Sequence, residues 1–235
     1  MRTNKIGHEL RLVIIGLLFC CSIIAVAGGT YASAASKKAR AMKAYRSFLA
    51  KNPSKFVSID FDWDTQNKEP ESAAAKFMLQ DLDGDKIPEL LTWRPVSFKY
   101  DEIHVFTYKN GKVVPVKSAN GTKAVIDISA QAEGYYKGIY VCKKHHLHTK
   151  WQSGSHYTKT VYKLQKGEMK TYLWKDYLTS DPVTFAEYAK PHITYLKYGE
   201  SIKGKEFKAL TVKCKKAKNG TFVKNTDANR KKYVK

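Results

Sequence analysis

Four carboxylates stand close together in a chain that is otherwise strongly basic. The stretch FMLQDLDGDKIPELLTW carries Asp81, Asp83, Asp85 and Glu89 in a protein of 235 residues with a formal net charge of +21. Counted from Asp81, they take positions 1, 3, 5 and 9, and Ile87 at position 7 can offer its backbone carbonyl. This oxygen-rich spacing is typical of loops that wrap a hard cation. The sequence therefore predicts a Ca²⁺ site with these five residues as ligands.

The residues around the acidic stretch exclude one kind of calcium site. Both flanks are apolar and predict β-strands, and position 12 is Thr92, where an EF-hand has a bidentate glutamate. The side chains at alternate positions would point into a tight loop, and Gly84, which has no side chain, reduces the crowding there. A helix–loop–helix EF-hand is therefore excluded, and a β-flanked loop is expected.

The stretch resembles the β-flanked calcium loops of integrin-type and related bacterial repeats. It also resembles a motif written DxDGDGxPEL, which occurs in exported, mostly uncharacterised proteins of Gram-positive bacteria, with a helix before it and a β-meander after it. The resemblance covers residues 40–120, and the ending NTDANRKKY is similar to that of some of these proteins. It implies an exported, calcium-binding protein. Lys86 departs from the motif, because glycine is expected there and a positive φ costs other residues about 1 kcal/mol. The alternative is an acidic hairpin turn that binds nothing.

The N-terminus carries the features of an export signal. Basic residues precede the apolar run LVIIGLLFCCSIIAVAGG, and the small-x-small pattern Ala-Ser-Ala follows at residues 32–34. These features predict a signal peptide over residues 1–34. Because the run approaches the length of a membrane-spanning helix, an uncleaved anchor that tethers the protein is the alternative. Either way, we expect the remaining chain to be extracellular or at the cell surface.

The positive charge belongs to the part that is expected to be exported. Only three of the 42 basic residues and one of the 21 acidic residues precede residue 35. For an exported protein, the nearest polyanions are cell-wall polymers and anionic lipid head groups. Nucleic acid would suit the charge but not the compartment. We therefore expect an anionic wall polymer or a membrane surface as the partner.

Residues 35–235 predict a single α+β domain built on an antiparallel β-meander. An amphipathic N-terminal helix is expected over residues 36–51, with Met42, Tyr45, Phe48 and Leu49 on its apolar face. Besides the two strands that flank the acidic loop (81–89), strands are predicted over residues 56–63, 103–108, 113–116, 138–151, 156–164 and 168–174.

Turn and cap residues place the remaining elements. Asn110-Gly111 and Lys166-Gly167 predict hairpin turns, and Pro115 restricts its strand to a sheet edge. Asp181-Pro182 predicts a short helix over residues 181–190, and Thr226 predicts the cap of a last helix that reaches Tyr233. The lysine-rich residues 201–224 predict a strand pair around Asn219-Gly220.

Two acidic residues offer an enzymatic alternative. The stretch SIDFDWD resembles the DxDxE strand of chitinase-like glycosidases, with Asp62 and Asp64 as the acidic pair. The alternative function is therefore a hydrolase that acts on cell-wall or other polysaccharides. Those enzymes use a β/α barrel, and this chain has neither the length nor the alternation of strands and helices for one. A solvated acidic face of one strand is the plainer interpretation.

Histidine and cysteine residues offer a further alternative. Cys142, His146 and His148 share one face of a predicted strand, with His156 across the next turn. They could hold Zn²⁺ or Cu²⁺, or they could form a polar outer face. Cys142 and Cys214 are the two cysteines after residue 34, and they form either one disulfide or two separate thiols.

The sequence contains no GxSxG, HExxH, phosphate-binding glycine loop or dinucleotide fingerprint. We therefore expect an exported, calcium-binding module that binds a ligand and has no catalytic residues.

Overall fold

The computed structural model describes residues 35–54, 70, 72–97, 100–129, 134–141, 145–153, 156–180, 187–212, 218–219 and 221–235. The chain divides into two compact units, Met1–Arg40 and Ala41–Lys235, and both sheets belong to the second. The predicted signal peptide or anchor lies outside the described residues. Within these ranges, no helix is both long enough and apolar enough to cross a membrane.

The smaller of the two sheets contains the strands on either side of the acidic loop. Its order is β14-β1-β2-β3-β4, and β6 also pairs with β3. Its strands are β1 (Lys76–Gln80), β2 (Glu89–Ser97), β3 (Tyr100–Lys109), β4 (Lys112–Pro115), β6 (Val125–Ser129) and β14 (Val223–Lys224). Pro115 ends β4 at an edge of the sheet, as predicted, because proline has no N–H for a further ladder bond.

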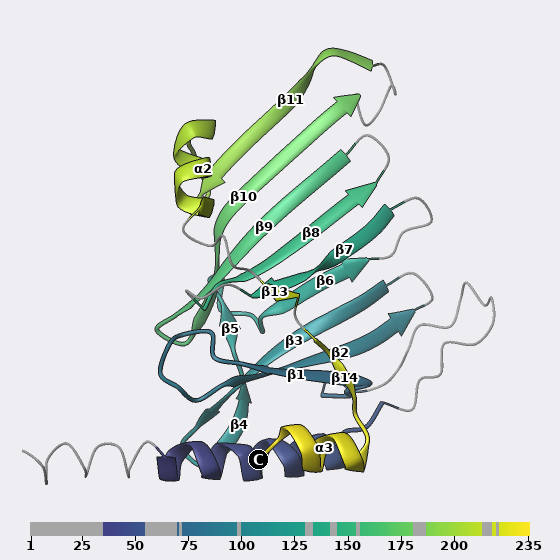
Figure 1. Cartoon of the computed structure of the whole chain (residues 1–235), viewed down its shortest axis with the longest axis vertical. Coiled ribbons are helices and arrows are strands. Elements are labelled where there is room, and N and C mark those ends of the chain that lie inside the picture. The colour runs from purple at the N-terminus through teal and green to yellow at the C-terminus, as the bar shows by residue number, and fades with distance from the viewer. Residues whose placement is uncertain are drawn as a thin grey trace, which may run out of the picture. The chain divides into compact units, whose positions relative to one another are not determined.

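The larger sheet has the order β12-β11-β10-β9-β8-β7-β13, and β5 pairs with β10 in parallel. Figure 1 shows β7 to β11 side by side in this order. Its strands are β5 (Lys117–Ser118), β7 (Gly134–Val141), β8 (Leu147–Ser153), β9 (His156–Gln165), β10 (Glu168–Ser180), β11 (Glu187–Lys197), β12 (Glu200–Ser201) and β13 (Lys218–Asn219).

Two tight turns confirm the hairpins predicted from sequence. Asn110 and Gly111 have φ values of 51° and 80°, and they join β3 to β4. Lys166 and Gly167 have φ values of 53° and 78°, and they join β9 to β10. Positive φ at both central residues gives the turn a twist that matches paired strands.

One hydrophobic core joins the two sheets. Side chains from β1, β2, β3 and β6 meet side chains from β8, β9 and β10, and all of them are nearly inaccessible to water. The described core residues are Met78, Leu82, Leu91, Ile103, Val105, Val116, Ala124, Ile126, Leu147, Leu164 and Met169.

A second core lies beneath the smaller sheet. The helix that is described over residues 35–51 buries Met42, Tyr45 and Leu49 against this sheet, and Phe48 is partly buried there, as its predicted apolar face required. Val234, directly after α3 (Asp227–Tyr233), is buried in the same cluster. Thr226 caps α3 by accepting a hydrogen bond from the Asn229 N–H, as predicted.

Asn225 ties the two ends of this unit together. Its side-chain Nδ2 donates to the carbonyl oxygens of Leu49 and Ala74, each at 3.0 Å, and its Oδ1 accepts from Arg230 at 2.9 Å. One amide thereby connects the end of the N-terminal helix, the segment before β1, and α3.

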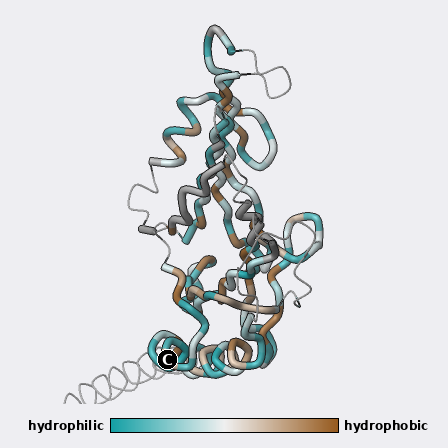
Figure 2. Tube along the Cα trace, turned by 90° about the vertical axis from the view of Figure 1, so that its right-hand side faces the viewer, coloured by the Kyte–Doolittle hydropathy of each residue, from teal (hydrophilic) through white to brown (hydrophobic). Residues whose placement is uncertain are grey.

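A third cluster lies on the opposite side of the larger sheet from the shared core. Helix α2 (Gly204–Val212) packs there, and Figure 2 shows it to one side of the strands. Its Phe207 is buried against Val161 and Leu173, and the ring of Tyr195 lies 5.0 Å from that of Phe207.

The predicted α+β fold class, one antiparallel meander with helices at its ends, is wrong. The described chain is dominated by two mainly antiparallel β-sheets, and helices are few and short. Residues 138–151 were predicted as one strand, but they contribute to two, β7 and β8.

Two further predictions fail in the C-terminal half. The helix predicted over residues 181–190 is wrong, because Glu187–Lys197 forms strand β11. The predicted strand pair within residues 201–224 is also wrong. Part of that stretch is α2, and β13 and β14 pair with β7 and β1 and not with each other. The strand predicted over residues 56–63 lies outside the described residues.

We expect Asn225→Ala to lower the free energy of unfolding by about 1–3 kcal/mol, because the carbonyl oxygens of Leu49 and Ala74 both lose the Nδ2 donor, with only the Ser54 N–H left at Ala74, and Arg230 loses its acceptor. Urea unfolding followed by circular dichroism measures this loss. Asn229→Ala removes a single, exposed amide bond to the Lys224 carbonyl and should cost much less. Equal losses in the two variants would contradict the linking role of Asn225.

Candidate metal centre

The acidic loop is fixed at both ends by strand pairing. Gln80 and Glu89 lie opposite each other in the β1–β2 register, so residues 81–88 form a closed connection between paired strands. The loop therefore follows strands on both sides, as the sequence predicted, and its ends cannot move apart without breaking the β1–β2 ladder.

Carboxylates hold the loop in shape by accepting bonds from its own backbone. Asp81 accepts from the N–H groups of Gly84 and Lys86 at 2.7 and 3.2 Å. Asp83 accepts from the N–H of Asp85 at 3.0 Å. Asx-type bonds of this kind stabilise tight turns.

The backbone of the loop confirms the strain expected at position 6. Lys86 has φ of 69°, and Gly84 has φ of 87°. Only glycine adopts such angles without cost, so Lys86 holds a conformation that destabilises the loop by about 1 kcal/mol.

Three of the five predicted ligands come together. One carboxylate oxygen from each of Asp81, Asp83 and Glu89 lies within 4.8 Å of the other two, and these three residues could hold a metal ion. Among the described residues, this is the one group of three or more His, Cys, Asp or Glu side chains close enough to do so. All the donors are hard oxygens, which suit Ca²⁺, Mg²⁺ or Mn²⁺ better than softer metals.

The other two predicted ligands lie beside this group. The Oδ1 of Asp85 accepts a bond from the N–H of Ile87 at 2.7 Å, and Asp85 is outside the group of three. The Ile87 side chain is buried in the cluster beneath the smaller sheet, so it anchors the end of the loop.

Glu89 is the most unusual residue of the site. Its side chain is only 2 % exposed, and it accepts bonds from the N–H of Leu82 at 2.8 Å and the hydroxyl of Thr107 at 3.3 Å. Burial, together with the nearby charges of Asp83 and Asp85, raises the pKa of Glu89 to about 8. An ionised carboxylate at this position is costly without a positive charge beside it.

Tyr45 of the N-terminal helix is buried on the same side. Burial raises the pKa of the Tyr45 hydroxyl, and the charges of Glu89 and Asp85 raise it further. Tyr45 therefore places a neutral phenol near the site, and this side chain adds no positive charge to balance Glu89.

His145 is a loop contact that the sequence analysis missed. It precedes β8, its Nδ1 donates to the Asp81 carbonyl oxygen at 2.8 Å, and its ring would lie 3.7 Å from a Cβ placed on Gly84. His145 also has a positive φ of 62°, so its backbone is held in an unusual conformation. The sequence analysis proposed the neighbouring His146 as a zinc ligand. The sequence around His145 has no motif or spacing that would mark it as a contact of the acidic loop.

Among the described residues, the predicted zinc ligands His146, His148 and His156 do not form a metal-binding group. His146 packs against the ring of Tyr172, and His156 bonds to Asp176 at 2.5 Å. His148 is 4 % exposed, so it is not part of a polar outer face. Cys142 and Cys214 lie outside the described residues, as do Asp62 and Asp64 of the hydrolase alternative.

His148 is buried without a hydrogen bond to its Nε2 among the described residues. Burial lowers its pKa to about 4, helped by the charges of Lys159, His146 and Lys150. The imidazole is therefore neutral in the folded protein at neutral pH.

We expect acid to destabilise the protein through His148. Its pKa is about 4 when folded and 6.5 as a free group, so the unfolded chain binds the extra proton between these values. The free energy of unfolding should fall by about 2 kcal/mol from pH 7 to pH 5 on this account. Chemical unfolding of the unmodified protein and of His148→Gln at both pH values isolates the effect.

The variant His148→Gln should lose that part of the pH dependence, whereas His192→Gln, at an exposed histidine, should retain it. An identical pH dependence in His148→Gln and the unmodified protein would show that His148 is protonated without cost in the fold.

Comparison of the chain with protein-family models, with curated proteins and with solved structures finds no match in any of the three. The assignment of this site therefore depends on its own geometry and chemistry.

Proposed function

We propose that this protein is an exported, calcium-stabilised binding module without catalytic activity, and that it attaches to an anionic cell-wall polymer or membrane surface. Glu89 is the observation that carries the calcium part. A nearly inaccessible carboxylate beside two further acids is unfavourable unless a cation joins them. A Ca²⁺ ion at this place would attract the Glu89 carboxylate and so offset the free-energy cost of burying its charge.

Calcium suits the loop better than other metals. The three grouped carboxylates supply oxygen only, and Ca²⁺ takes six to eight oxygen ligands in flexible geometry. Asp85 and the carbonyl of Ile87 would bring the protein ligands to five, as the resemblance to the DxDGDGxPEL loops implies, and bidentate carboxylates or water would supply the remaining oxygens. Mg²⁺ demands a tighter octahedral arrangement and gives up its waters reluctantly, so it fits a compact loop less well.

Calcium would link more than two strands. The loop contacts His145, which lies two residues before β8 of the larger sheet, and Glu89 bonds to Thr107 of β3. A bound ion would therefore hold β1, β2 and β3 in register and keep the His145 contact in place. Its role would be structural, consistent with the weak affinities of about 10⁻⁴–10⁻³ M that are common in extracellular calcium modules.

A row of lysines supports the anionic partner. Lys150, Lys159 and Lys175 lie directly opposite one another on β8, β9 and β10. Like charges in opposed positions destabilise a sheet, because the side chains start only about 5 Å apart. A polymer with repeated negative charges would be attracted to such a row.

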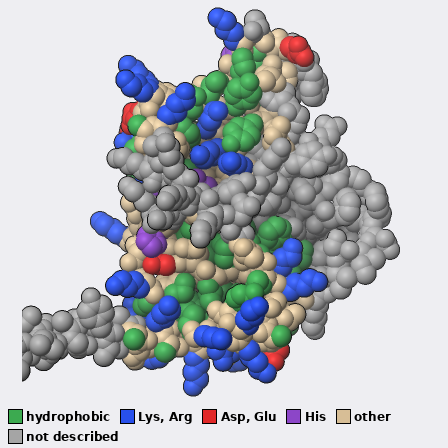
Figure 3. Space-filling view, in the orientation of Figure 1, with side chains coloured by type: hydrophobic (Ala, Val, Ile, Leu, Met, Phe, Trp, Pro, Cys, Tyr) green, Lys and Arg blue, Asp and Glu red, His purple; other side chains and the backbone are tan. Residues whose placement is uncertain are grey.

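Aromatic residues lie beside the lysine row. The Lys175 ammonium lies 5.6 Å from the ring centre of Tyr157 and 5.4 Å from that of Tyr177. Figure 3 shows Lys and Arg side chains among hydrophobic ones over the upper strands of the larger sheet.

The calcium site predicts a thermal shift. Thermal melts at pH 8, where a proton competes less with metal for Glu89, should show a higher Tm in millimolar Ca²⁺ than in chelator. A ligand at 100 times its Kd adds about 2.7 kcal/mol, which raises Tm by several degrees. Asp81→Ala and Asp83→Asn should abolish the shift, and Glu168→Gln, in an exposed hairpin, should keep it.

Glu89→Gln gives the sharpest form of this test. It keeps an oxygen for the Leu82 N–H and removes the buried charge, so it should stabilise the metal-free protein and abolish the response to Ca²⁺. Lys86→Gly should strengthen the response, whereas Lys166→Gly relieves a similar backbone angle far from the loop and should stabilise without changing it. If Ca²⁺ does not change the Tm of the unmodified protein, the calcium proposal is wrong and the loop is an acidic turn that binds no metal.

The lysine row predicts salt-sensitive binding that depends on position. The triple variant Lys150→Gln/Lys159→Gln/Lys175→Gln should lose most of its binding to a soluble polyphosphate and to anionic lipid vesicles. Binding of the unmodified protein should weaken steeply with salt, because screening shortens from about 8 Å at physiological ionic strength to about 3 Å at 1 M. Co-sedimentation and titration measure both effects.

A second triple variant, Lys109→Gln/Lys112→Gln/Lys166→Gln, removes the same charge from two exposed hairpin turns. It should retain most of the binding. Equal losses in the two triple variants would show that net charge, and not the row, attracts the polyanion.

A further inference from the structure

A large cavity opens on the side of the larger sheet that faces away from α2. Its volume is about 1130 Å³, above the range of roughly 300–1,000 Å³ that is usual for small-molecule sites. Trp174 and Leu196 line it, and their chain neighbours Leu173 and Tyr195 contact α2 on the other side. Alternation along β10 and β11 therefore separates the cavity from the lysine row.

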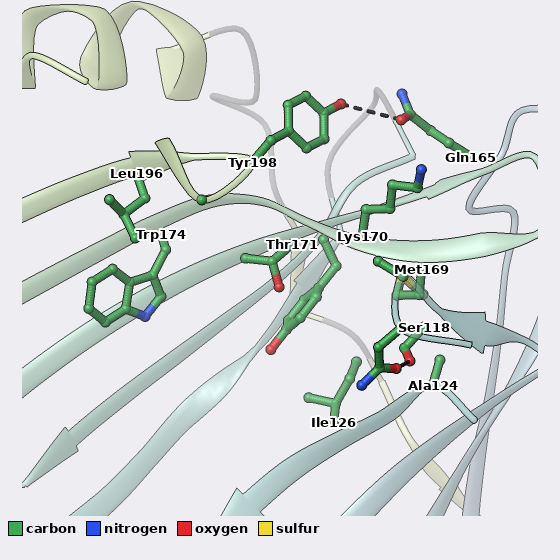
Figure 4. Close-up of a pocket in the computed structure, with 14 residues that line it drawn as sticks. Ser118, Ala124, Ile126, Gln165, Met169, Lys170, Thr171, Trp174, Leu196 and Tyr198 are labelled. Atoms are coloured by element: carbon green, nitrogen blue, oxygen red, sulfur yellow. Dashed lines mark hydrogen bonds between the residues drawn. The ribbon is translucent and has the colours of Figure 1, made fainter. Parts of the chain in front are cut away.

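Aromatic and aliphatic groups form the walls of the cavity. Tyr162, Trp174 and Tyr198 contribute rings, and buried Ile126 and Met169 contribute the apolar floor. Figure 4 shows Trp174 and Leu196 at one end, Tyr198 and Gln165 across the opening, and Ile126 below. Tyr198 is exposed and Trp174 is half-buried, and rings of this kind offer flat surfaces for stacking.

The two amide side chains at the rim, Gln165 and Asn120, bond to the protein through their oxygens. The Oε1 of Gln165 accepts from the Tyr198 hydroxyl at 3.3 Å, as the dashed line in Figure 4 marks. The Oδ1 of Asn120 accepts from the Thr122 N–H at 3.2 Å and also from hydroxyls of Ser118 and Thr122. Because both amide oxygens are used within the protein, both NH₂ groups are the parts presented to a ligand.

A tight turn holds one wall in place. Tyr198 and Gly199 have φ values of 51° and 87°, and the Tyr198 N–H donates to the Tyr172 carbonyl at 3.1 Å. The Tyr198 ring also lies 5.1 Å from that of Tyr172. The side of the cavity opposite Trp174 is therefore preformed in the protein without a ligand.

The charge of the cavity favours a neutral ligand. Lys170 is the charged residue among those described in the lining, and its ammonium lies 3.4 Å from the Glu168 carboxylate. The remaining polar groups are amides and hydroxyls. A matching ligand would combine apolar C–H faces with neutral oxygen acceptors.

We propose that this cavity binds a glycan chain of N-acetylated hexoses. A pyranose ring offers a C–H face that stacks on Trp174 and Tyr198, and the acetamido carbonyl accepts from the NH₂ groups of Gln165 and Asn120. The volume exceeds that of one small ligand, so several consecutive sugar units would occupy it. This proposal does not depend on the calcium site or on the lysine row.

Titration of the full protein with tri-N-acetylglucosamine tests the proposal, with maltotriose as the control sugar without acetamido groups. Calorimetry or NMR should show millimolar or tighter binding of the first sugar and at least about tenfold weaker binding of the second, since unpaired amide donors weaken binding. Absence of binding by tri-N-acetylglucosamine, or equal binding of the two sugars, would overturn the proposal.

Two variants test the named contacts. Gln165→Glu keeps an acceptor for Tyr198 and replaces the donor NH₂ with a carboxylate oxygen, so binding should weaken at least about tenfold. Gln152→Glu makes the same change on β8, outside the cavity, and should bind normally. Trp174→Ala should weaken binding by a similar factor, with its fold checked by a thermal melt.

Full binding by Gln165→Glu would overturn the assignment of the acetamido contact. Loss of binding in the lysine-row triple variant, with Gln165→Glu unaffected, would place the sugar on the other side of the sheet and overturn the cavity as its site. We expect Ca²⁺ to have no effect on sugar binding. The absence of a Ca²⁺-dependent Tm shift would therefore not count against the sugar site.

Discussion

The β1–β2 ladder is the constraint on which the other features depend. Five residue pairs hold these strands in register, from Lys76 opposite Trp93 to Gln80 opposite Glu89. A shift by one residue would turn every side chain to the other face, so Leu90 and Leu91 would exchange cores and Glu89 would leave its buried position. The hydrophobic contacts of two different cores therefore decide that an acid is buried at the end of β2.

The same constraint explains why the acidic loop is both ordered and electrostatically unfavourable. The N–H groups of Gly84, Asp85 and Ile87 bond to carboxylates of the loop itself, so much of its shape is fixed locally. Those carboxylates then face one another and Glu89 at short range. Local hydrogen bonding thus fixes an arrangement that long-range electrostatics opposes, and this combination is typical of sites that a cation completes.

Features that depend on neighbouring residues were predictable from the sequence. The Asn110-Gly111 and Lys166-Gly167 turns, the Thr226 cap, the apolar face of the N-terminal helix and the positive φ of Lys86 all follow from local geometry. Features that depend on distant partners were not. Glu187–Lys197 carries proline, which favours a helix start or stop in sequence, but pairing with β10 makes it a strand. Its irregular register there accommodates Pro191 at the outer side of the sheet.

The candidate site shows the same division. Spacing alone indicated the carboxylates, whereas His145 comes from a segment 64 residues away and has no signature in the sequence. Likewise, β13 and β14 lie four residues apart in the chain but complete different sheets, which no local pattern distinguishes. Long-range pairing, and not propensity, selected these partners.

The contact of Arg46 with the Val234 carbonyl joins residues separated by 188 positions, and Asn225 reaches back 176 positions to Leu49. During synthesis, the N-terminal helix leaves the ribosome long before either partner exists. Such non-local closure slows folding, because a long loop must be ordered before its contacts form. The N-terminal helix therefore cannot make these two contacts until the last residues of the chain have been synthesised.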